Sequence, residues 1–171
     1  MGSGSHADKR VVVTGAGGHI GSEVIRSLLR SGDREVVPLV RRQAATGRFG
    51  PAVPVVADYD DEPALRRALT GADTLVMVSS DGPVAQVITH HANLIDAARH
   101  AGIAHIVALS GLDARAESPF CYAQGYAYTE RLLREGYTEA DLEKIWSGNV
   151  LRVLKAVEAV AEKTARTPEA K

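Results

Sequence analysis

The sequence predicts an α/β fold in which a parallel sheet of five strands, in the order 3-2-1-4-5, has helices on both faces. Three observations support this prediction. Short apolar runs alternate with segments of helical periodicity along most of the chain. The run TLVMV at residues 74–78 is almost entirely apolar, as in a strand covered on both faces. The segment RVVVTGAGGHIG at residues 10–21 leads from an apolar run through spaced glycines into a helix.

Each element follows from a local pattern. Pro38 is unusual inside a strand, because proline cannot donate a ladder hydrogen bond. Asp60 or Asp61 is the expected cap of one helix, and Gly102 the expected end of the next. Residues 41–52 lack periodicity and predict a loop. The predicted strands are residues 11–14, 35–40, 53–57, 74–78 and 105–109, and the predicted helices are residues 20–30, 62–69, 83–101 and 122–135.

The sequence pattern changes after Gly136. Two short amphipathic helices are expected there, packed on the sheet, with Trp146 as a hydrophobic anchor. The start, MGSGSH, resembles an expression-vector sequence rather than a signal peptide. The predicted division is a tag at residues 1–9, an α/β region at residues 10–135, a helical segment at residues 136–163 and a tail at residues 164–171.

The composition excludes several kinds of protein. The chain has 171 residues, 45% of them hydrophobic, and a formal net charge of −1. No broad attraction to nucleic acid or to a membrane surface is therefore expected. No apolar run approaches the roughly 20 residues of a membrane span. The single cysteine, Cys121, rules out an internal disulfide and suits a reducing compartment, so we expect a cytoplasmic protein.

The glycines after the first strand predict a phosphate site. Gly15 permits a tight turn, Gly18 lets a pyrophosphate approach the backbone, and Gly21 lets the helix lie close to the strand. The free N–H groups of the helix start then face the anion. A merely structural turn is the alternative. The fold class is thus a Rossmann-like three-layer sandwich, and the backbone between the three glycines consists of Ala16, Gly17, His19 and Ile20.

Other strand ends carry further candidates for the site. Arg41 and Arg42 follow the second strand, where NAD-preferring proteins place an acid, and their guanidinium groups favour a 2′-phosphate. A solvated basic turn is the alternative. Val78, Ser79 and Ser80 end the fourth strand and are expected to flank the sugars of the cofactor, and Leu109, Ser110 and Gly111 end the fifth strand, on the side of the nicotinamide.

Several reactive residue types have simpler interpretations. His90 and His91 are adjacent on a helix, so they cannot jointly hold a metal, and we expect them on the helix surface. Cys121 shows no sign of activation. Tyr122 and Tyr126, with Tyr128, are expected to pack in the helix and the pocket. No metal site is predicted.

Residues 10–134 resemble the NmrA-like branch of the atypical short-chain dehydrogenase/reductases, including its quinone-reductase-like members. The resemblance implies NADP(H) as cofactor and places Asp58 and Tyr59 beside the adenine. The alternative for Asp58 is that it merely caps a turn. It also places Ser110 where the wider superfamily keeps an active serine, but the Tyr–Lys partner is missing, so no catalytic residue is assigned. The matching segments are VVVTGAGGHIGSEVIRSLL, VADYDDEPALRRALTGADTLVMVSS, NLIDAARHAGIAHIVALSGLDA and YAYTERLLRE.

The segment LLREGYTEADLEKIWSGNVLRVLKAVEAVAE instead resembles the C-terminal helices of the renal dipeptidase family. We place the seam between the two resemblances at residues 129–136. None of that family's metal ligands is present, so no dipeptidase activity is expected. The preferred hypothesis is an engineered chimera that binds NADP(H) weakly without catalysis. The alternatives are an NADPH-dependent quinone or carbonyl reductase, an NADP-sensing module, or a natural chain whose tail resembles a dipeptidase by chance. An exposed edge on the fifth strand would permit a homodimer.

Overall fold

The computed structural model describes residues 9–43, 47–111 and 113–136. The predicted helices of residues 136–163, the tail and Trp146 lie almost entirely outside the described residues. The elements, in chain order, are β1 (Arg10–Val13), α1 (His19–Ser31), β2 (Glu35–Val40), β3 (Val55–Val56), α2 (Glu62–Leu69), β4 (Thr74–Met77), α3 (Val84–Ala101), β5 (His105–Ala108) and α4 (Cys121–Gly136).

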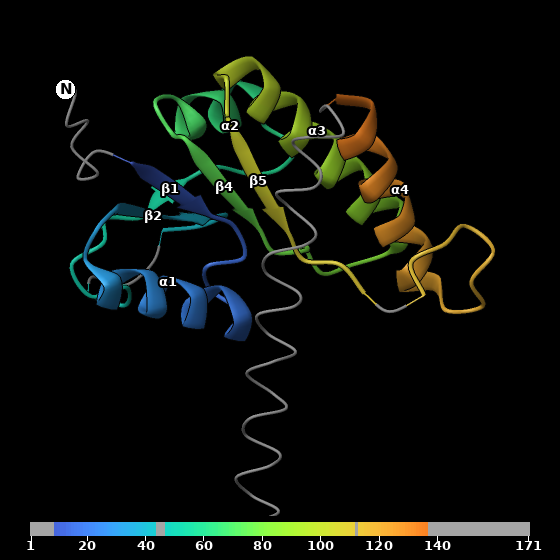
Figure 1. The fold of residues 1–171 in the computed structure, drawn as a ribbon, viewed down its shortest axis with the longest axis horizontal. Helices are drawn as coiled ribbons and strands as arrows, with labels where there is room; N and C mark the ends of the chain where they lie inside the picture. The colour runs from blue at the N-terminus through green and yellow to red at the C-terminus, as the bar shows by residue number, and fades with distance from the viewer. Residues whose placement is uncertain (1–8, 44–46, 112, 137–171) are drawn as a thin grey trace, which may run out of the picture.

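The sheet has the predicted architecture. Its strand order is β3-β2-β1-β4-β5, and every pairing is parallel. Helix α1 lies on one side of the sheet, and α2, α3 and α4 lie on the other (Figure 1). The three layers of the prediction are therefore confirmed. Because connections between parallel strands must cross over a face of the sheet, the carboxyl ends of all five strands meet at one edge.

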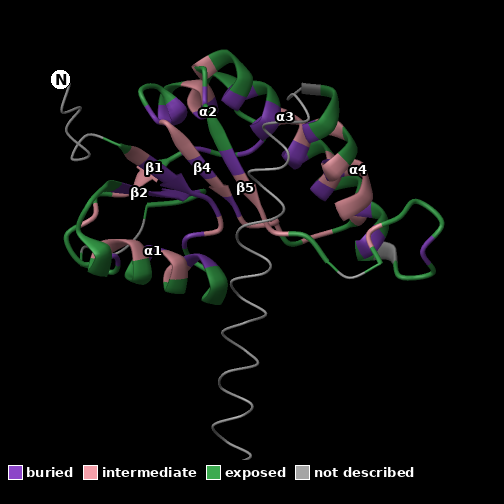
Figure 2. Cartoon of the chain, in the orientation of Figure 1, coloured by how far each residue is buried: buried purple, intermediate pink, exposed green. Residues whose placement is uncertain are grey.

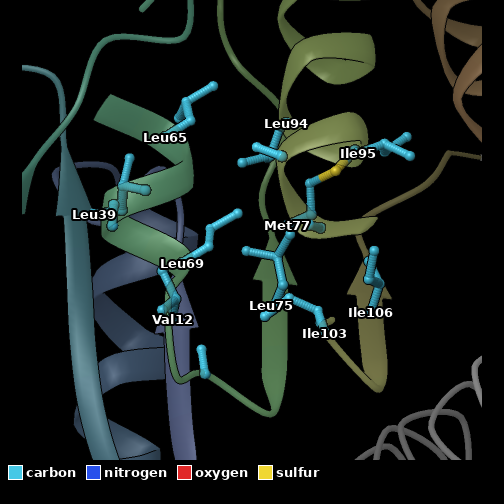
Figure 3. Close-up of a cluster of buried hydrophobic side chains, with 14 of the residues drawn as sticks. Val12, Leu39, Leu65, Leu69, Leu75, Met77, Leu94, Ile95, Ile103 and Ile106 are labelled. Atoms are coloured by element: carbon cyan, nitrogen blue, oxygen red, sulfur yellow. The ribbon is translucent and has the colours of Figure 1, made fainter. Parts of the chain in front are cut away.

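Alternate residues of β1 build the two cores. Val12 joins the core under α2 and α3, where Leu69, Leu75 and Leu94 are buried to 1% exposure or less (Figure 3). Val11 and Val13 join the smaller core under α1. A central parallel strand that is covered on both faces is expected to be mostly apolar, as β1 is after Arg10 and β4 is after Thr74. Figure 2 shows this burial concentrated in the strands and in the helix faces toward them.

The largest departure from the predicted strands is β3. It contains only Val55 and Val56 rather than residues 53–57, because Val53 is 75% exposed and Pro54 has no N–H to donate. The short β3 also explains how β2 accommodates Pro38. The β2–β3 pairing begins at Leu39, one residue beyond the proline.

The helix ends follow their capping signals. Asp61, one of the two predicted caps, accepts a hydrogen bond from the backbone N–H of Ala64 at 2.9 Å and begins α2. Gly102 ends α3 in the left-handed conformation, with φ +70°. No helix among the described residues is long and apolar enough to cross a membrane.

Candidate cofactor site

A cavity with a volume of about 770 Å³ lies at the carboxyl ends of the strands. This size suits a small-molecule or cofactor site. Asp58 and Ser110 are not part of its wall. The predicted residues that line it are Gly15, Gly17, Gly18, His19, Ile20, Gly21, Arg41, Arg42, Tyr59, Val78, Ser79 and Ser80.

The glycine-rich loop is held by contacts that only glycine permits. Gly15 adopts φ +58°, and its carbonyl accepts a hydrogen bond from the N–H of Gly18 at 2.9 Å. A Cβ on Gly21 would lie 2.3 Å from the Gly15 oxygen, which is closer than any real contact. Gly18 is the N-cap of α1, with no side chain to bind the first N–H groups and no acidic residue in the first turn. The helix start is therefore free to bind an anion.

Thr14 joins the two strands whose divergence forms the crevice. Its hydroxyl donates to the carbonyl of Val78 at 3.0 Å and accepts from the N–H of Val78 at 2.9 Å. Thr14 is completely buried. These side-chain bonds continue the connection between β1 and β4 beyond their paired backbone residues, just before the two strands diverge. They fix the distance between the glycine-rich loop and the end of β4.

Three arginines line the cavity on the side of β2. Arg41 and Arg42 are exposed, and neither forms an ion pair with a described carboxylate. Arg48 was not predicted from the sequence. Its guanidinium donates to the carbonyl of Gly17 at 2.6 Å, and its neighbour Phe49 is buried in the core under α1. Phe49, the single aromatic residue of its loop, is the sequence signal that could have indicated that this loop packs against the core.

Tyr59 and Asp58 have different environments. Burial raises the pKa of the Tyr59 phenol, while hydrogen bonds to the Thr14 side chain and the Gly15 backbone and the charge of Arg41 oppose the rise. The phenol therefore stays protonated beside the glycine-rich loop. Asp58 is exposed and accepts the N–H of Asp60 at 3.1 Å. This contact matches the turn-capping alternative for Asp58.

The prediction of surface histidines on α3 is wrong. His90 and His91 are each 2% exposed, because α3 packs against α2 and α4 and both rings face polar partners. His90 Nδ1 lies 3.1 Å from Ser80 Oγ, and His91 Nε2 lies 3.2 Å from Ser79 Oγ. Burial, followed by the charge of His90, lowers the pKa of His91 to about 4. The two serines at the end of β4 are therefore each held by a buried imidazole.

The end of β5 carries a second polar pair. Ser110 Oγ donates to Glu130 Oε1 at 2.6 Å. The partner of the Ser110 hydroxyl is thus a carboxylate of α4, and not the Tyr–Lys pair that the sequence lacks. The ring of Tyr126 packs against the backbone of Gly111 and lines the cavity, together with Tyr122. Tyr126 therefore packs as predicted, whereas Tyr122 lines the cavity but is 48% exposed. No cluster of metal-ligating side chains occurs within the described ranges.

Comparisons with known proteins agree with this geometry. Residues 15–148 match the NAD(P)H-binding family. The chain is 36% identical to quinone oxidoreductase 2 of Escherichia coli K12 over 128 residues, which cover 73% of this chain and 44% of that protein.

Two solved structures are also similar. The NADPH complex of an E. coli NADPH-dependent quinone oxidoreductase superposes with a TM-score of 0.66 and 35% identity, covering 74% of this chain and 45% of the other. The NADP(H) complex of Citrobacter sp. triphenylmethane reductase gives 0.67 and 27%, covering 74% and 46%. The chain thus spans less than half the length of these relatives.

The contact between α1 and the glycine-rich loop predicts the effect of one methyl group. Gly21→Ala is expected to lower the free energy of unfolding by about 2 kcal/mol or more, because its Cβ would collide with backbone atoms that cannot move independently. Gly17→Ala is the matched control, since its Cβ would meet only Arg48 Nη2 at 3.7 Å. Urea unfolding measures both. Equal stability of the two variants would contradict the close approach.

The buried His91 predicts a pH dependence of stability. The folded imidazole stays neutral down to about pH 4, whereas the unfolded one takes up a proton near the ordinary histidine pKa of 6.5. The unfolded state thus binds more protons in this range, and stability falls as the pH drops below 6.5. Between pH 6.5 and about pH 5, wild type should lose roughly 2 kcal/mol more than His91→Gln. The exposed control His105→Gln should follow wild type in urea titrations; identical slopes in all three would contradict the buried neutral state.

Proposed function

The chain belongs to the NAD(P)H-binding family, and from that premise we propose that it binds NADP(H) in this cavity and reduces a quinone or a similar small carbonyl compound. One observation carries the proposal: the free N-terminal amides of α1 and the arginines after β2 open into the same cavity. The amides suit a pyrophosphate, and the arginines suit a 2′-phosphate.

The residues present fit the cofactor. The glycine-rich loop leaves the space above Gly18 free of side-chain atoms, and a larger residue there would crowd the Gly15 carbonyl, 3.3 Å from an added Cβ. Arg41 and Arg42 would hold the 2′-phosphate. Ser79 and Ser80 would contact the sugar on the other side of the crevice. When bound, NADPH would supply a hydride, and the chain would supply binding and orientation. Leu109, Tyr122 and Tyr126 line the cavity and would face the nicotinamide.

The relatives favour a reductase over a scaffold without catalysis. Quinone oxidoreductase 2 is an oxidoreductase by name, and the family match continues to residue 148, beyond the seam proposed at residues 129–136. The chimera, the dipeptidase-like origin of residues 136–163 and the NADP-sensing role remain competing hypotheses. The homodimer is likewise a proposal. Its motivation is that β5 pairs on one side only among the described strands.

The direct test is turnover of a simple quinone. The purified chain is expected to oxidise NADPH in the presence of 1,4-benzoquinone. The measurement is the loss of NADPH absorbance, which should be faster than in the absence of protein. Gly18→Val should abolish this rate, because the larger side chain would crowd the Gly15 carbonyl and fill the pyrophosphate position. Val53→Ala, at a 75% exposed position, is the control and should keep the wild-type rate. NADPH binding without turnover would leave the cofactor site but reject the reductase.

Cofactor choice is tested at the arginines. The double variant Arg41→Met, Arg42→Met removes two positive charges while keeping the aliphatic length of the side chains. Its Kd for NADP⁺ is expected to rise tenfold or more, roughly the contribution of one or more charge-assisted hydrogen bonds, while its Kd for NAD⁺ stays nearly constant. Arg30→Met, at the far end of α1, is the control for the loss of a positive charge away from the cavity. Calorimetry that shows equal losses for NADP⁺ and NAD⁺ would contradict a 2′-phosphate role.

A further inference from the structure

A chain of four polar groups runs from α4 to the wall of the cavity. Thr129 Oγ1 lies 2.9 Å from the carbonyl oxygen of Gly125, and His91 Nδ1 lies 2.6 Å from Thr129 Oγ1. His91 Nε2 then lies 3.2 Å from Ser79 Oγ, and Ser79 lines the cavity. Thr129 and His91 are each 2% exposed, so solvent does not replace any of these bonds.

The contact between the two oxygens sets the direction that we infer for each hydrogen bond in the chain. Two oxygens 2.9 Å apart require a hydrogen between them, so the Thr129 hydroxyl donates to the Gly125 carbonyl. Thr129 Oγ1 must then accept, which makes His91 Nδ1 the protonated nitrogen. His91 Nε2 is left as an acceptor, and the Ser79 hydroxyl is its donor.

The Ser79 hydroxyl has one competing acceptor. Its oxygen lies 3.3 Å from the Ser80 carbonyl, longer than the contacts made by Thr129. Donation to that carbonyl would leave the lone pair of His91 Nε2 unpaired in a buried position, which costs about 1–3 kcal/mol. The bond to His91 is therefore preferred. Since the only hydrogen of the Ser79 hydroxyl is used, its oxygen can act toward the cavity only as an acceptor.

We propose that His91 is a positioning residue that holds Ser79 as a hydrogen-bond acceptor for a sugar hydroxyl of the cofactor. This inference rests on the proposed function. The arginines lie at the end of β2, and the glycine-rich loop lies between them and β4, so Ser79 belongs to the half of the cavity away from the 2′-phosphate. The hydroxyl is therefore one on the ribose next to the nicotinamide, which can donate where a phosphate oxygen cannot.

The neutral state of His91 is what the arrangement needs. An imidazolium would donate from both nitrogens, and Ser79 would then accept from Nε2 and point its hydrogen elsewhere. Burial lowers the pKa of His91 to about 4, so the ring is neutral near pH 7. His90 differs, because its Nε2 is buried without a hydrogen-bond partner and lies 3.6 Å from Asp60 Oδ1. No tautomer is fixed there, and the inference is limited to His91.

The tautomer is read directly from nitrogen chemical shifts of the full-length, isotope-labelled protein near pH 7. The expected signature is a neutral His91 protonated at Nδ1. Thr129→Val, which keeps the shape but removes the acceptor, should shift the ring toward the Nε2-protonated form, and Thr129→Ser should restore the wild-type signature. An Nε2-protonated or charged His91 in wild type would overturn the proposal.

Affinity measurements then test whether this tautomer of His91 contributes to cofactor binding. Ser79→Ala and Thr129→Val are each expected to weaken NADP⁺ about fivefold, which corresponds to one net hydrogen bond. Neither should weaken 2′,5′-ADP, which carries the 2′-phosphate but lacks the nicotinamide and its ribose. The double variant should lose no more than Ser79→Ala alone, because Thr129 acts through Ser79. Thermal unfolding of each variant confirms that it is folded.

The outcomes separate the two proposals. If wild type binds neither NADP⁺ nor 2′,5′-ADP, the cofactor site itself is wrong, and this inference falls with it. If wild type binds both, equal losses for both ligands or additive losses in the double variant would overturn the role of His91 alone. A Thr129→Val protein that does not fold leaves the decision to Ser79→Ala and to the wild-type tautomer.

Discussion

The approach of α1 to β1 at Gly21 is the constraint on which the rest of the site depends. With a Cβ excluded at 2.3 Å from the Gly15 oxygen, the helix start is brought directly over the end of the strand. That position directs the free amides of α1 into the cavity and sets where any pyrophosphate must lie. The Thr14 hydroxyl then connects β1 to Val78, the residue that follows β4. Backbone contacts thus define one wall of the crevice, and a side-chain hydroxyl fixes the other wall relative to it.

The two sides of the cavity use different physical means. On the β2 side, exposed guanidinium groups supply positive charge, and Phe49 anchors the loop that carries one of them. On the β4 side, hydrogen bonds run from half-buried Ser79 through the buried, neutral His91 to Thr129 of α4. Charge attracts a phosphate over several ångströms with little demand on geometry, whereas a neutral hydrogen bond requires a fixed direction. The arrangement thus assigns capture to one side and orientation to the other.

The sheet and the glycine-rich loop could be predicted because their signals are local. The apolar runs of β1, β2 and β4, and the glycine spacing, each depend on neighbouring residues, and β2 has the predicted bounds. The strand β3 was predicted too long because Pro54 limits pairing in a way that apolarity does not reveal. The buried positions of His90 and His91 depend on the packing of α3 against α2 and α4, which are distant in sequence. The Ser110–Glu130 bond likewise joins residues twenty apart in sequence, which carry no mutual periodicity.

The buried histidines also show how polar groups can be tolerated in this core. An unpaired imidazole nitrogen costs about as much as a lost hydrogen bond, so a buried ring needs partners that the apolar layers cannot supply; His91 has hydrogen-bond partners at both nitrogens, His90 only at Nδ1. His91 has such partners because Ser79, just after β4, contacts one ring nitrogen and Thr129 of α4 contacts the other. Helix α4 is consequently tied to the strand end by directional bonds as well as by the packing of Leu133. A displacement of α4 would reach Ser79 through His91, so the geometry of the cavity wall depends on a helix that contributes Tyr126 to the same cavity.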